Sequence, residues 1–366
     1  MKFLKPIDGD VLFSVGDGKV VDGKLVASVT VQAAPGKTIA INGVAAAENN
    51  GSYTAEISLD GCKNAVEAVD LATGEKIQMV IYWFSHGYHT YRLGVDDVIW
   101  SLENIYKNQD TYTSIFDDPF FALYRDLHEK YSTPVHMHIY YQNEDGSFNL
   151  SMFPDKYQKD FQENWHWLKL TFHSFTDQPD RPYLHASYDQ VLKEGQMVCN
   201  EIRRFTGIQE SPRVTSQHWC ECPPEVCHAF RDLGYDCMDG YFRYDENGVP
   251  VASFYFDNDM VDHLADRDFW VSHDDDVLYV KDDIIINEVP LADIDAQMDS
   301  ICSERDNCFL YLLIHEQYFY EKFILFEPDY RERIFATVDW CHRNGYTPET
   351  ITAIMEKSGW NRQNKK

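Results

Sequence analysis

Hydrophobic and polar residues alternate along the first part of the chain, between residues 10 and 85. This period of two residues is typical of strands that bury one face, and it occurs in the runs KLVASVTV (24–31), KTIAI (37–41), YTAEISL (53–59), NAVEAVD (64–70) and KIQMVIYWF (76–84). Asn42-Gly43 and Asp60-Gly61 are turn residues between them. Short strands at this spacing predict an antiparallel β-sandwich over residues 1–86.

From residue 87 onward the pattern changes to short apolar runs that are followed by amphipathic segments with helical spacing. The apolar runs include RLGV (92–95), PVHMHIYY (134–141), WLKLTFHSF (167–175), RVTSQHW (213–219) and NCFLYLLIHEQYFY (307–320). The segments FFALYRDLHEKYS (120–132) and SYDQVLKEGQMVCNEIRRFTG (187–207) predict helices between them. Alternating strands and helices predict parallel strands joined by crossovers, so residues 87–366 form an α/β domain with an open sheet or a barrel.

Composition narrows the class of partner. The chain has 366 residues, of which 44% are hydrophobic and 14% are aromatic, so it is long enough for two domains with a substantial core. Its formal charge of −28 argues against nucleic acid and against an anionic membrane, because both attract clustered Lys and Arg. The many aromatic side chains suit a groove that stacks on sugar rings.

The N-terminus and the cysteines indicate the compartment. MKFLKPIDGDVLFSVGDG lacks the apolar stretch of a secretory signal, and no window approaches a membrane span. The 9 cysteines are irregularly spaced, which favours reduced thiols. We therefore expect a cytoplasmic protein, although a processed secreted form would have the same features.

Ionisable residues follow several of the predicted strands directly. Asp96 and Asp97 follow RLGV, His173 follows WLKLTF, His218 follows RVTSQ, and His315 with Glu316 follows FLYLLI. Because the carboxyl ends of parallel strands meet at one edge, these side chains are expected to converge. Carboxylates with imidazoles suit zinc, iron, cobalt or nickel better than calcium or magnesium.

The two adjacent aspartates pose a geometric condition. Neighbouring residues of an extended strand point to opposite sides, so Asp96 and Asp97 can both face one site only if the backbone turns there. The alternative is that one of them caps the following helix, SLENIY (101–106).

These motifs resemble those of the NodB-like polysaccharide deacetylases. YRLGVDDVIW (91–100) resembles the first motif, LTFHSFTD (170–177) the second, and LYLLIHEQYFY (310–320) the late histidine motif. The resemblance implies a distorted (β/α) barrel that binds zinc or a similar ion and removes acetyl groups from sugars. It also implies that Asp96 is the catalytic base, Asp97 and His173 are metal ligands, and His315 protonates the leaving group. The sandwich resembles the small immunoglobulin-like domains that accompany carbohydrate-active enzymes, as a sugar-binding module or a spacer.

The chain departs from the family pattern at several positions. Val98 replaces the glycine after the aspartate pair, and Asp177 replaces the second metal histidine. The third ligand is then Asp177 or His185, and His185 is favoured because an imidazole preserves the ligand set. PRVTSQHWCECP (212–223) stands in place of the third motif. The remaining expectations concern the surroundings of the metal: His218 and Trp219 line the site, Asp177 and Glu316 orient the imidazoles, and Trp219, Tyr318 and Tyr320 stack on sugar.

Two further polar segments of the larger domain have other interpretations. His136 and His138 share one face of a strand and could be ligands, but their position favours buried or groove residues. HDDDVLYVKDD (273–283) predicts a solvated turn.

Two other functions are possible alternatives to a deacetylase. One is a degenerate barrel that binds carbohydrate without turnover. The other is a glycosidase with paired carboxylates, which would not need the histidines.

Overall fold

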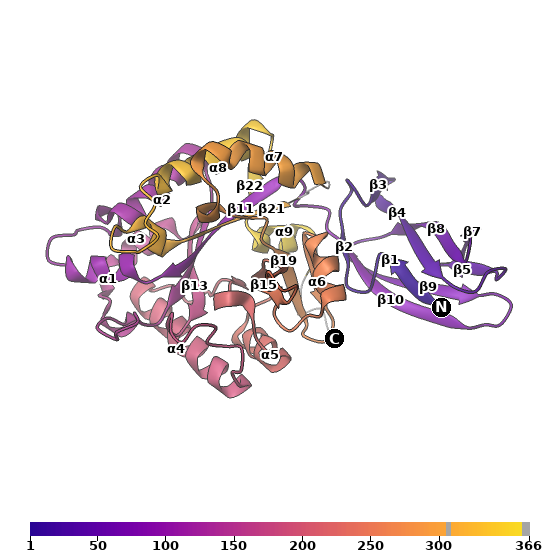
Figure 1. Ribbon diagram of the computed structural model, residues 1–366, viewed down its shortest axis with the longest axis horizontal. Helices are drawn as coiled ribbons and strands as arrows, with labels where there is room; N and C mark the ends of the chain where they lie inside the picture. Colours follow the sequence, from indigo (N-terminus) through magenta and orange to yellow (C-terminus); the bar gives the residue numbers. More distant parts are fainter. Residues whose placement is uncertain (305–308, 361–366) are drawn as a thin grey trace. The chain divides into compact units, whose positions relative to one another are not determined.

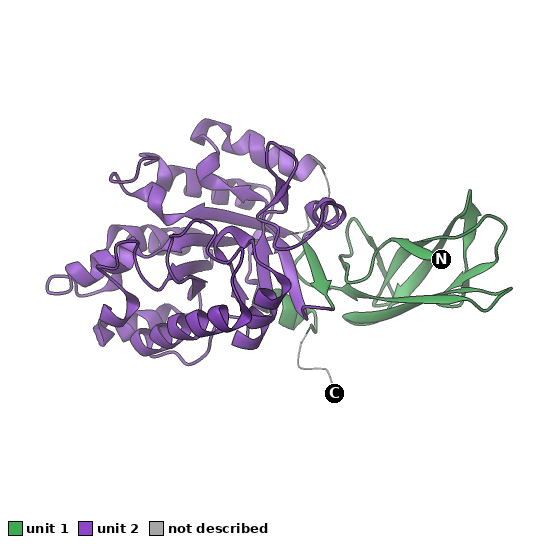
Figure 2. Ribbon diagram, turned by 60° about the horizontal axis from the view of Figure 1, so that its bottom comes forward, with its two compact units in different colours: residues 1–88, 269–273, 353–366 green, residues 89–268, 274–352 purple. Residues whose placement is uncertain are grey.

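The computed structural model describes residues 1–304 and 309–360, and the chain divides into two compact units (Figure 2). The smaller unit contains residues 1–88 and 269–273 together with the chain from residue 353 on, and the larger contains residues 89–268 and 274–352. The boundary after Tyr88 lies close to the sequence-based one after residue 86. No pattern in the sequence indicated the two later segments of the smaller unit.

The smaller unit contains two β-sheets. One sheet has the order β1-β4-β8-β7, with β3 beside β4, and consists of β1 (Lys2–Lys5), β3 (Gly18–Val21), β4 (Lys24–Gln32), β7 (Ala47–Asn49) and β8 (Ser52–Leu59). The other has the order β2-β10-β9-β5-β6 and consists of β2 (Val11–Leu12), β5 (Ile39–Ile41), β6 (Val44–Ala45), β9 (Lys63–Asp70) and β10 (Lys76–Trp83). All five predicted strands are present, and their neighbours are antiparallel except for β2 with β10.

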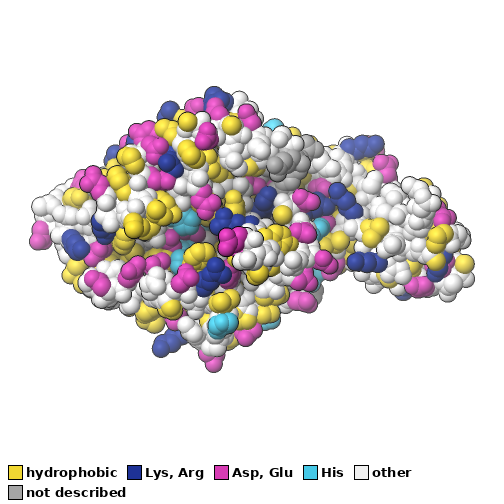
Figure 3. Space-filling model, viewed as in Figure 1, with side chains coloured by type: hydrophobic (Ala, Val, Ile, Leu, Met, Phe, Trp, Pro, Cys, Tyr) yellow, Lys and Arg dark blue, Asp and Glu magenta, His cyan; other side chains and the backbone are white. Residues whose placement is uncertain are grey.

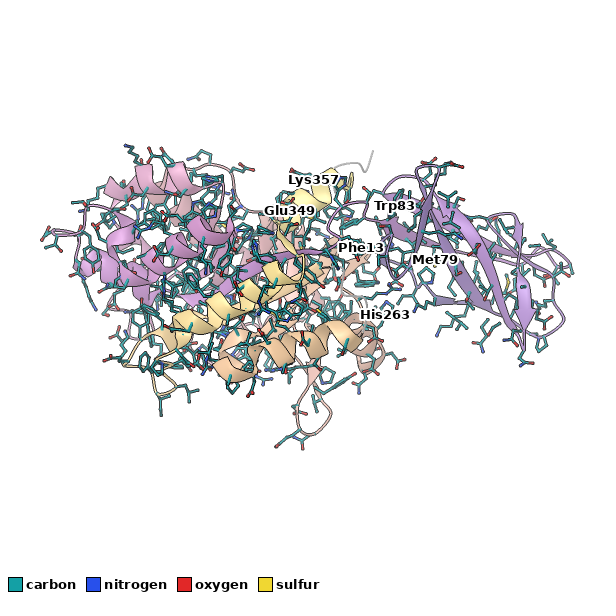
Figure 4. The ribbon with its side chains drawn as sticks, turned by 90° about the horizontal axis from the view of Figure 1, so that it is seen from above. Phe13, Met79, Trp83, His263, Glu349 and Lys357 are labelled. Atoms are coloured by element: carbon teal, nitrogen blue, oxygen red, sulfur yellow. The ribbon has the colours of Figure 1, made fainter. Side chains whose placement is uncertain are left out.

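Burial in the smaller unit follows the alternation in the sequence. In β4 the buried residues are Leu25, Ala27, Val29 and Val31, while the residues between them are exposed or half-buried. The same cluster includes Met79 and Trp83 of β10, which Figure 4 labels on their strand. One apolar face per sheet therefore forms the core. Immunoglobulin-like connectivity stays a prediction.

The larger unit contains a parallel sheet with the order β13-β12-β11-β21-β20, and β22 pairs with the start of β11. Its strands are β11 (Thr90–Val98), β12 (Val135–Tyr140), β13 (Leu168–Ser174), β20 (Ile284–Ile285), β21 (Phe309–His315) and β22 (Thr347–Pro348). Every residue of β11 and β12 is buried, as expected for strands covered on both faces.

A second group of parallel strands follows along the chain: β14 (Val214–Thr215), β15 (Cys237–Gly240) and β19 (Val277–Lys281). The two groups approach each other where the Thr215 hydroxyl donates to the Phe172 carbonyl of β13. Among the described residues the strand pairs do not form one closed barrel. The larger unit is thus an α/β arrangement with separate sheets of parallel strands, and the distorted barrel stays a prediction.

Helices lie outside these strands, with α2, α7 and α8 on one side and α4 and α5 on the other (Figure 1). The helices of the chain are α1 (Trp100–Lys107), α2 (Pro119–Tyr131), α3 (Gln158–Asn164), α4 (Tyr188–Thr206), α5 (Pro224–Leu233), α6 (Asn258–Ala265), α7 (Ile294–Glu304), α8 (Tyr330–Arg343) and α9 (Ile351–Lys357). The remaining strands are β16 (Arg243–Tyr244), β17 (Pro250–Val251) and β18 (Phe269–Ser272). Across residues 1–304 and 309–360, none of the helices has the length and apolar character needed to cross a membrane.

Candidate metal centre at the strand ends

The end of β11 turns so that both aspartates face one site. Val95 pairs with Met137 and Val98 pairs with Ile139, so β11 has one residue more than β12 over this stretch. Within this bulge Asp97 has φ 64, in the left-handed region that Asp and Asn tolerate better than most residues. Asp96 and Asp97 consequently line the same cavity, which meets the condition that the sequence set.

Three buried side chains bring one donor atom each to a common point. Asp97 Oδ1 lies 3.0 Å from His173 Nε2 and 3.2 Å from His218 Nδ1. The two imidazole nitrogens lie 3.1 Å from each other. Asp97, His173 and His218 form the group of the described residues that could hold a metal ion.

The spacing of these atoms fits a small transition-metal ion. Donors about 2.0–2.2 Å from a tetrahedral ion are roughly 3.4 Å apart, close to the distances seen here. His173 Nδ1 donates a hydrogen bond to the Ser216 carbonyl at 2.6 Å. The lone pair of Nε2 is then available to a metal ion. His218 Nε2 lies 3.4 Å from Asp177 Oδ1, so Asp177 can orient that ring. Three protein donors leave a position open for water and substrate.

The electrostatics of the group favour a cation. Burial opposes protonation of His218, but Asp97 and Asp177 raise its pKa to about 9. Burial alone would raise the pKa of Asp97, but His218 and His173 hold it well below its ordinary value. The group therefore stabilises positive charge, which a divalent ion would supply in place of the proton.

The third donor of the group differs from the ligand favoured by the sequence. His185 is exposed and does not line the cavity. His218, which was expected only to line the site, supplies the third donor instead. The reason lies in β14: the strand ends at Thr215, and the chain then forms a 3₁₀ turn over His218–Cys220 at the end of the sheet.

Asp96 remains outside the three-donor group but beside it. One carboxylate oxygen accepts from His138 Nδ1, and Oδ2 accepts from the Ser216 hydroxyl at 2.8 Å. Burial raises the pKa of Asp96, but His173 and His138 together hold it below its ordinary value. Asp96 is thus a fixed carboxylate 3.9 Å from His173 Nε2. Of the two strand histidines, His138 is buried as the partner of Asp96, and His136 is buried and lies outside the three-donor group.

His315 lies in the cavity wall, opposite Asp96 in the register of β21 and β11. Its Nδ1 lies 2.9 Å from Asn287 Oδ1, and Asn287 is buried. The amide oxygen only accepts, so Nδ1 carries the hydrogen and Nε2 is left for other partners. Two residues on, Gln317 Nε2 donates to Asp97 Oδ2 at 2.7 Å. Asn287 and Gln317 were not singled out from the sequence.

Tyr140 is another residue that sequence reasoning missed. It ends β12, and its hydroxyl contacts Asp97 Oδ1, lies 3.2 Å from Asp177 Oδ1 and lies 3.1 Å from His218 Nδ1. Burial, followed by Asp97 and Asp177, raises the pKa of Tyr140 well above its ordinary value, so it stays a hydroxyl. Its position at a strand end was the available signal, but tyrosines are common in apolar cores.

Glu316 has a different role from the one predicted. Its carboxylate accepts from the backbone N–H groups of Ile99, Trp100 and Ser101 at 2.6, 2.7 and 2.9 Å. It therefore caps the start of α1 and does not orient an imidazole. Because Glu316 satisfies these groups, neither aspartate of the pair is needed as the cap, and both are available to the site.

The cavity has a volume of about 360 Å³. Figure 3 shows histidine side chains inside a hollow of the larger unit, with acidic and basic side chains at its rim. Tyr318 and Trp219 line the cavity as predicted. Tyr320 does not: its ring packs against Trp100 and Phe120, at 5.5 and 6.3 Å between ring centroids.

No family model and no curated protein matches the chain. Among solved structures, 4-α-glucanotransferase from Thermococcus litoralis is 11% identical with a TM-score of 0.44, over 74% of this chain and 40% of that one. A Bacteroides fragilis protein with a provisional α-galactosidase assignment is 12% identical with a TM-score of 0.22, over 60% of this chain and 56% of that one. The chain thus spans less than two thirds of either protein. Both are named as carbohydrate-active enzymes, but at these TM-scores neither likeness carries an argument.

Proposed function

We propose that the chain is a metal-dependent hydrolase that removes an acetyl or other acyl group from a saccharide. The observation that carries the proposal is the three-donor group of Asp97, His173 and His218 with the carboxylate of Asp96, which is outside the group, beside it. A carboxylate next to an open metal position is what hydrolysis of an ester or amide needs. The resemblance to NodB-like deacetylases supports the same chemistry.

Asp97, His173 and His218 would hold the ion, and zinc, iron, cobalt and nickel suit this donor set. When bound, such an ion polarises an acyl carbonyl and lowers the pKa of water. The chain supplies the orientation: the Ser216 carbonyl fixes His173, Asp177 fixes His218, and Gln317 holds the second oxygen of Asp97.

Asp96 is the proposed base. It is ionised, it lines the cavity, and its two oxygens are held by His138 and Ser216. A carboxylate fixed in this way can take a proton from an attacking water without first losing side-chain freedom.

His315, the register neighbour of Asp96 on the adjacent strand β21, is the proposed acid. Its Nδ1–H is engaged by Asn287, so a proton on Nε2 points to the remaining partner, the departing nitrogen or oxygen of the sugar. Tyr140 adds a buried hydroxyl that keeps Asp97 and Asp177 in place.

The test is acetate release from acetylated saccharides by the metal-loaded protein. Asp96→Asn should retain the metal and lower turnover by about 10²- to 10⁴-fold, because it keeps the shape of the side chain and removes the base. The exposed His185→Ala is the matched control and should keep full turnover. Equal turnover by wild type and Asp96→Asn would contradict the proposal. Saccharide binding without acetate release from any acetylated sugar would favour the degenerate binding protein.

A further inference from the structure

Trp219 is next to His218 of the three-donor group in the sequence and has an unusual backbone conformation. It directly follows His218, lines the cavity and is 38% exposed. Its φ of 67 lies in the left-handed region, which is rare for a bulky side chain and persists only where the surroundings hold it. A large aromatic ring with part of its surface exposed therefore lines the cavity.

One face of the indole is covered by a clamped cation. The Arg181 guanidinium lies 4.8 Å from the centre of the ring. Arg181 Nη1 donates to both oxygens of Glu221, at 3.0 and 2.7 Å. Glu221 is 5% exposed and also accepts from the Ala252 backbone N–H at 3.2 Å. The buried carboxylate holds the guanidinium, and the guanidinium holds the ring.

The exposed part of the ring is thus an apolar surface within a polar wall. Asp177, Asp180 and Glu288 also line the cavity, and carboxylates accept hydrogen bonds from hydroxyls. A flat apolar ligand would displace water from these carboxylates without replacing its hydrogen bonds, at a free-energy cost. A pyranose ring satisfies both requirements, since it has a C–H face for the electron-rich indole and hydroxyls around its edge.

We propose that Trp219, held by Arg181 and Glu221, is the platform on which a pyranose ring of the ligand stacks beside the metal ligand His218. This inference rests on the saccharide substrate of the proposed function. It adds Trp219 as the residue that selects a sugar ring, and Arg181 and Glu221 as the residues that position Trp219.

The test measures binding, so it does not depend on turnover. Dissociation constants for chitotriose and for cellotriose, which lacks acyl groups, are determined by calorimetry in an Asp96→Asn background that leaves the ligand intact. Trp219→Leu should weaken binding roughly 5- to 10-fold, the scale of a lost ring contact, while Trp219→Phe retains most of the affinity. Arg181→Met should weaken binding about 2- to 5-fold, because the ring loses its support.

Two controls separate this inference from its alternatives. Tyr88→Leu changes a ring of similar exposure, 40%, that does not line the cavity, and should leave affinity unchanged. Metal content is measured for every variant, and Arg181→Met covers the case in which a change at Trp219 disturbs His218. Unchanged affinity in Trp219→Leu, or no binding of either sugar, would overturn the platform. Acetate release with affinity independent of Trp219 would sink the platform alone, whereas Trp219-dependent binding without acetate release would sink only the proposed hydrolysis.

Discussion

The core cluster of the smaller unit and the central strands of the larger unit bury different kinds of side chain. The core cluster of the smaller unit is apolar and includes Leu25, Val29 and Ile81, each with no exposed surface. The larger unit buries Arg92 and His138 just as completely, within its central strands. Burying a charge costs free energy unless it is paired and hydrogen-bonded. The core cluster of the smaller unit thus contains no charged side chain, while the central strands of the larger unit contain charged groups that must be paired.

The charged interior of the larger unit leads to the candidate site. Arg92 Nη2 donates to the Tyr311 hydroxyl at 2.7 Å and lies 3.3 Å from His138 Nε2. His138 in turn donates to Asp96. Buried polar side chains therefore connect the middle of the sheet with the proposed base. In the larger unit, the polar residues inside the central strands thus lead to the candidate site.

Removal of the buried charge of Arg92 should have the largest effect on the stability of the larger unit. Arg92→Met should lower the free energy of unfolding by about 3–5 kcal/mol, because buried carboxylates lose their positive neighbour. Burial raises the pKa of Asp239 and, more strongly, that of Asp282, and Arg92 opposes both rises. Denaturant titration measures the effect, and adding Asp282→Asn should restore part of it. A change below about 1 kcal/mol would mean that the charge is not needed to offset these carboxylates.

A second prediction uses pH on a buried acid of the larger unit. Burial raises the pKa of Glu316 to about 7, although three backbone N–H groups donate to it. The folded state therefore favours the neutral acid, so its stabilisation is present below the unfolded pKa near 4.5 and is lost as pH rises through 7. From pH 5 to pH 8 the wild type should lose about 2–3 kcal/mol relative to Glu316→Gln. Parallel pH profiles of the two proteins would count against this role.

The smallest expected effect on stability comes from a substitution in the apolar core of the smaller unit. Ile81→Val in the sandwich core removes one methylene and should cost about 0.5–1.5 kcal/mol in denaturant unfolding. Metal content and acetate release should stay at wild-type levels, because the substitution touches only an apolar core. Loss of metal in Ile81→Val would show that the smaller unit contributes to the site, against the division drawn above.

Much of the fold could be predicted because burial leaves a period in the sequence. The alternation in KLVASVTV became β4, and the helical spacing after Ser187 became α4, which ends before Gly207 as expected. The segment HDDDVLYVKDD was misjudged: it contains β19, whose first four residues are buried. Acids at both ends of a five-residue strand hide its apolar centre from a composition-based judgement.

The site was predictable where a strand end fixes the side chain. Asp96, Asp97, His173 and His315 all line the expected cavity, because the parallel strands β11, β13 and β21 end at one edge. The third ligand depended on how a loop folds: the sequence offered Asp177 or His185, whereas the donor group of the structure contains His218, which was expected only to line the site. No local sequence pattern indicates that β14 ends after two residues or that His218 begins a 3₁₀ turn at the end of the sheet.

The central claim is that Asp97, His173 and His218 hold a transition metal, and elemental analysis of three proteins tests it most directly. The wild type and His185→Ala should each contain close to one equivalent of zinc, iron, cobalt or nickel, and His218→Ala should lose it. Both substitutions remove an imidazole, but only His218 lies in the donor group. Metal that persists in His218→Ala, or that disappears in His185→Ala, would contradict the account.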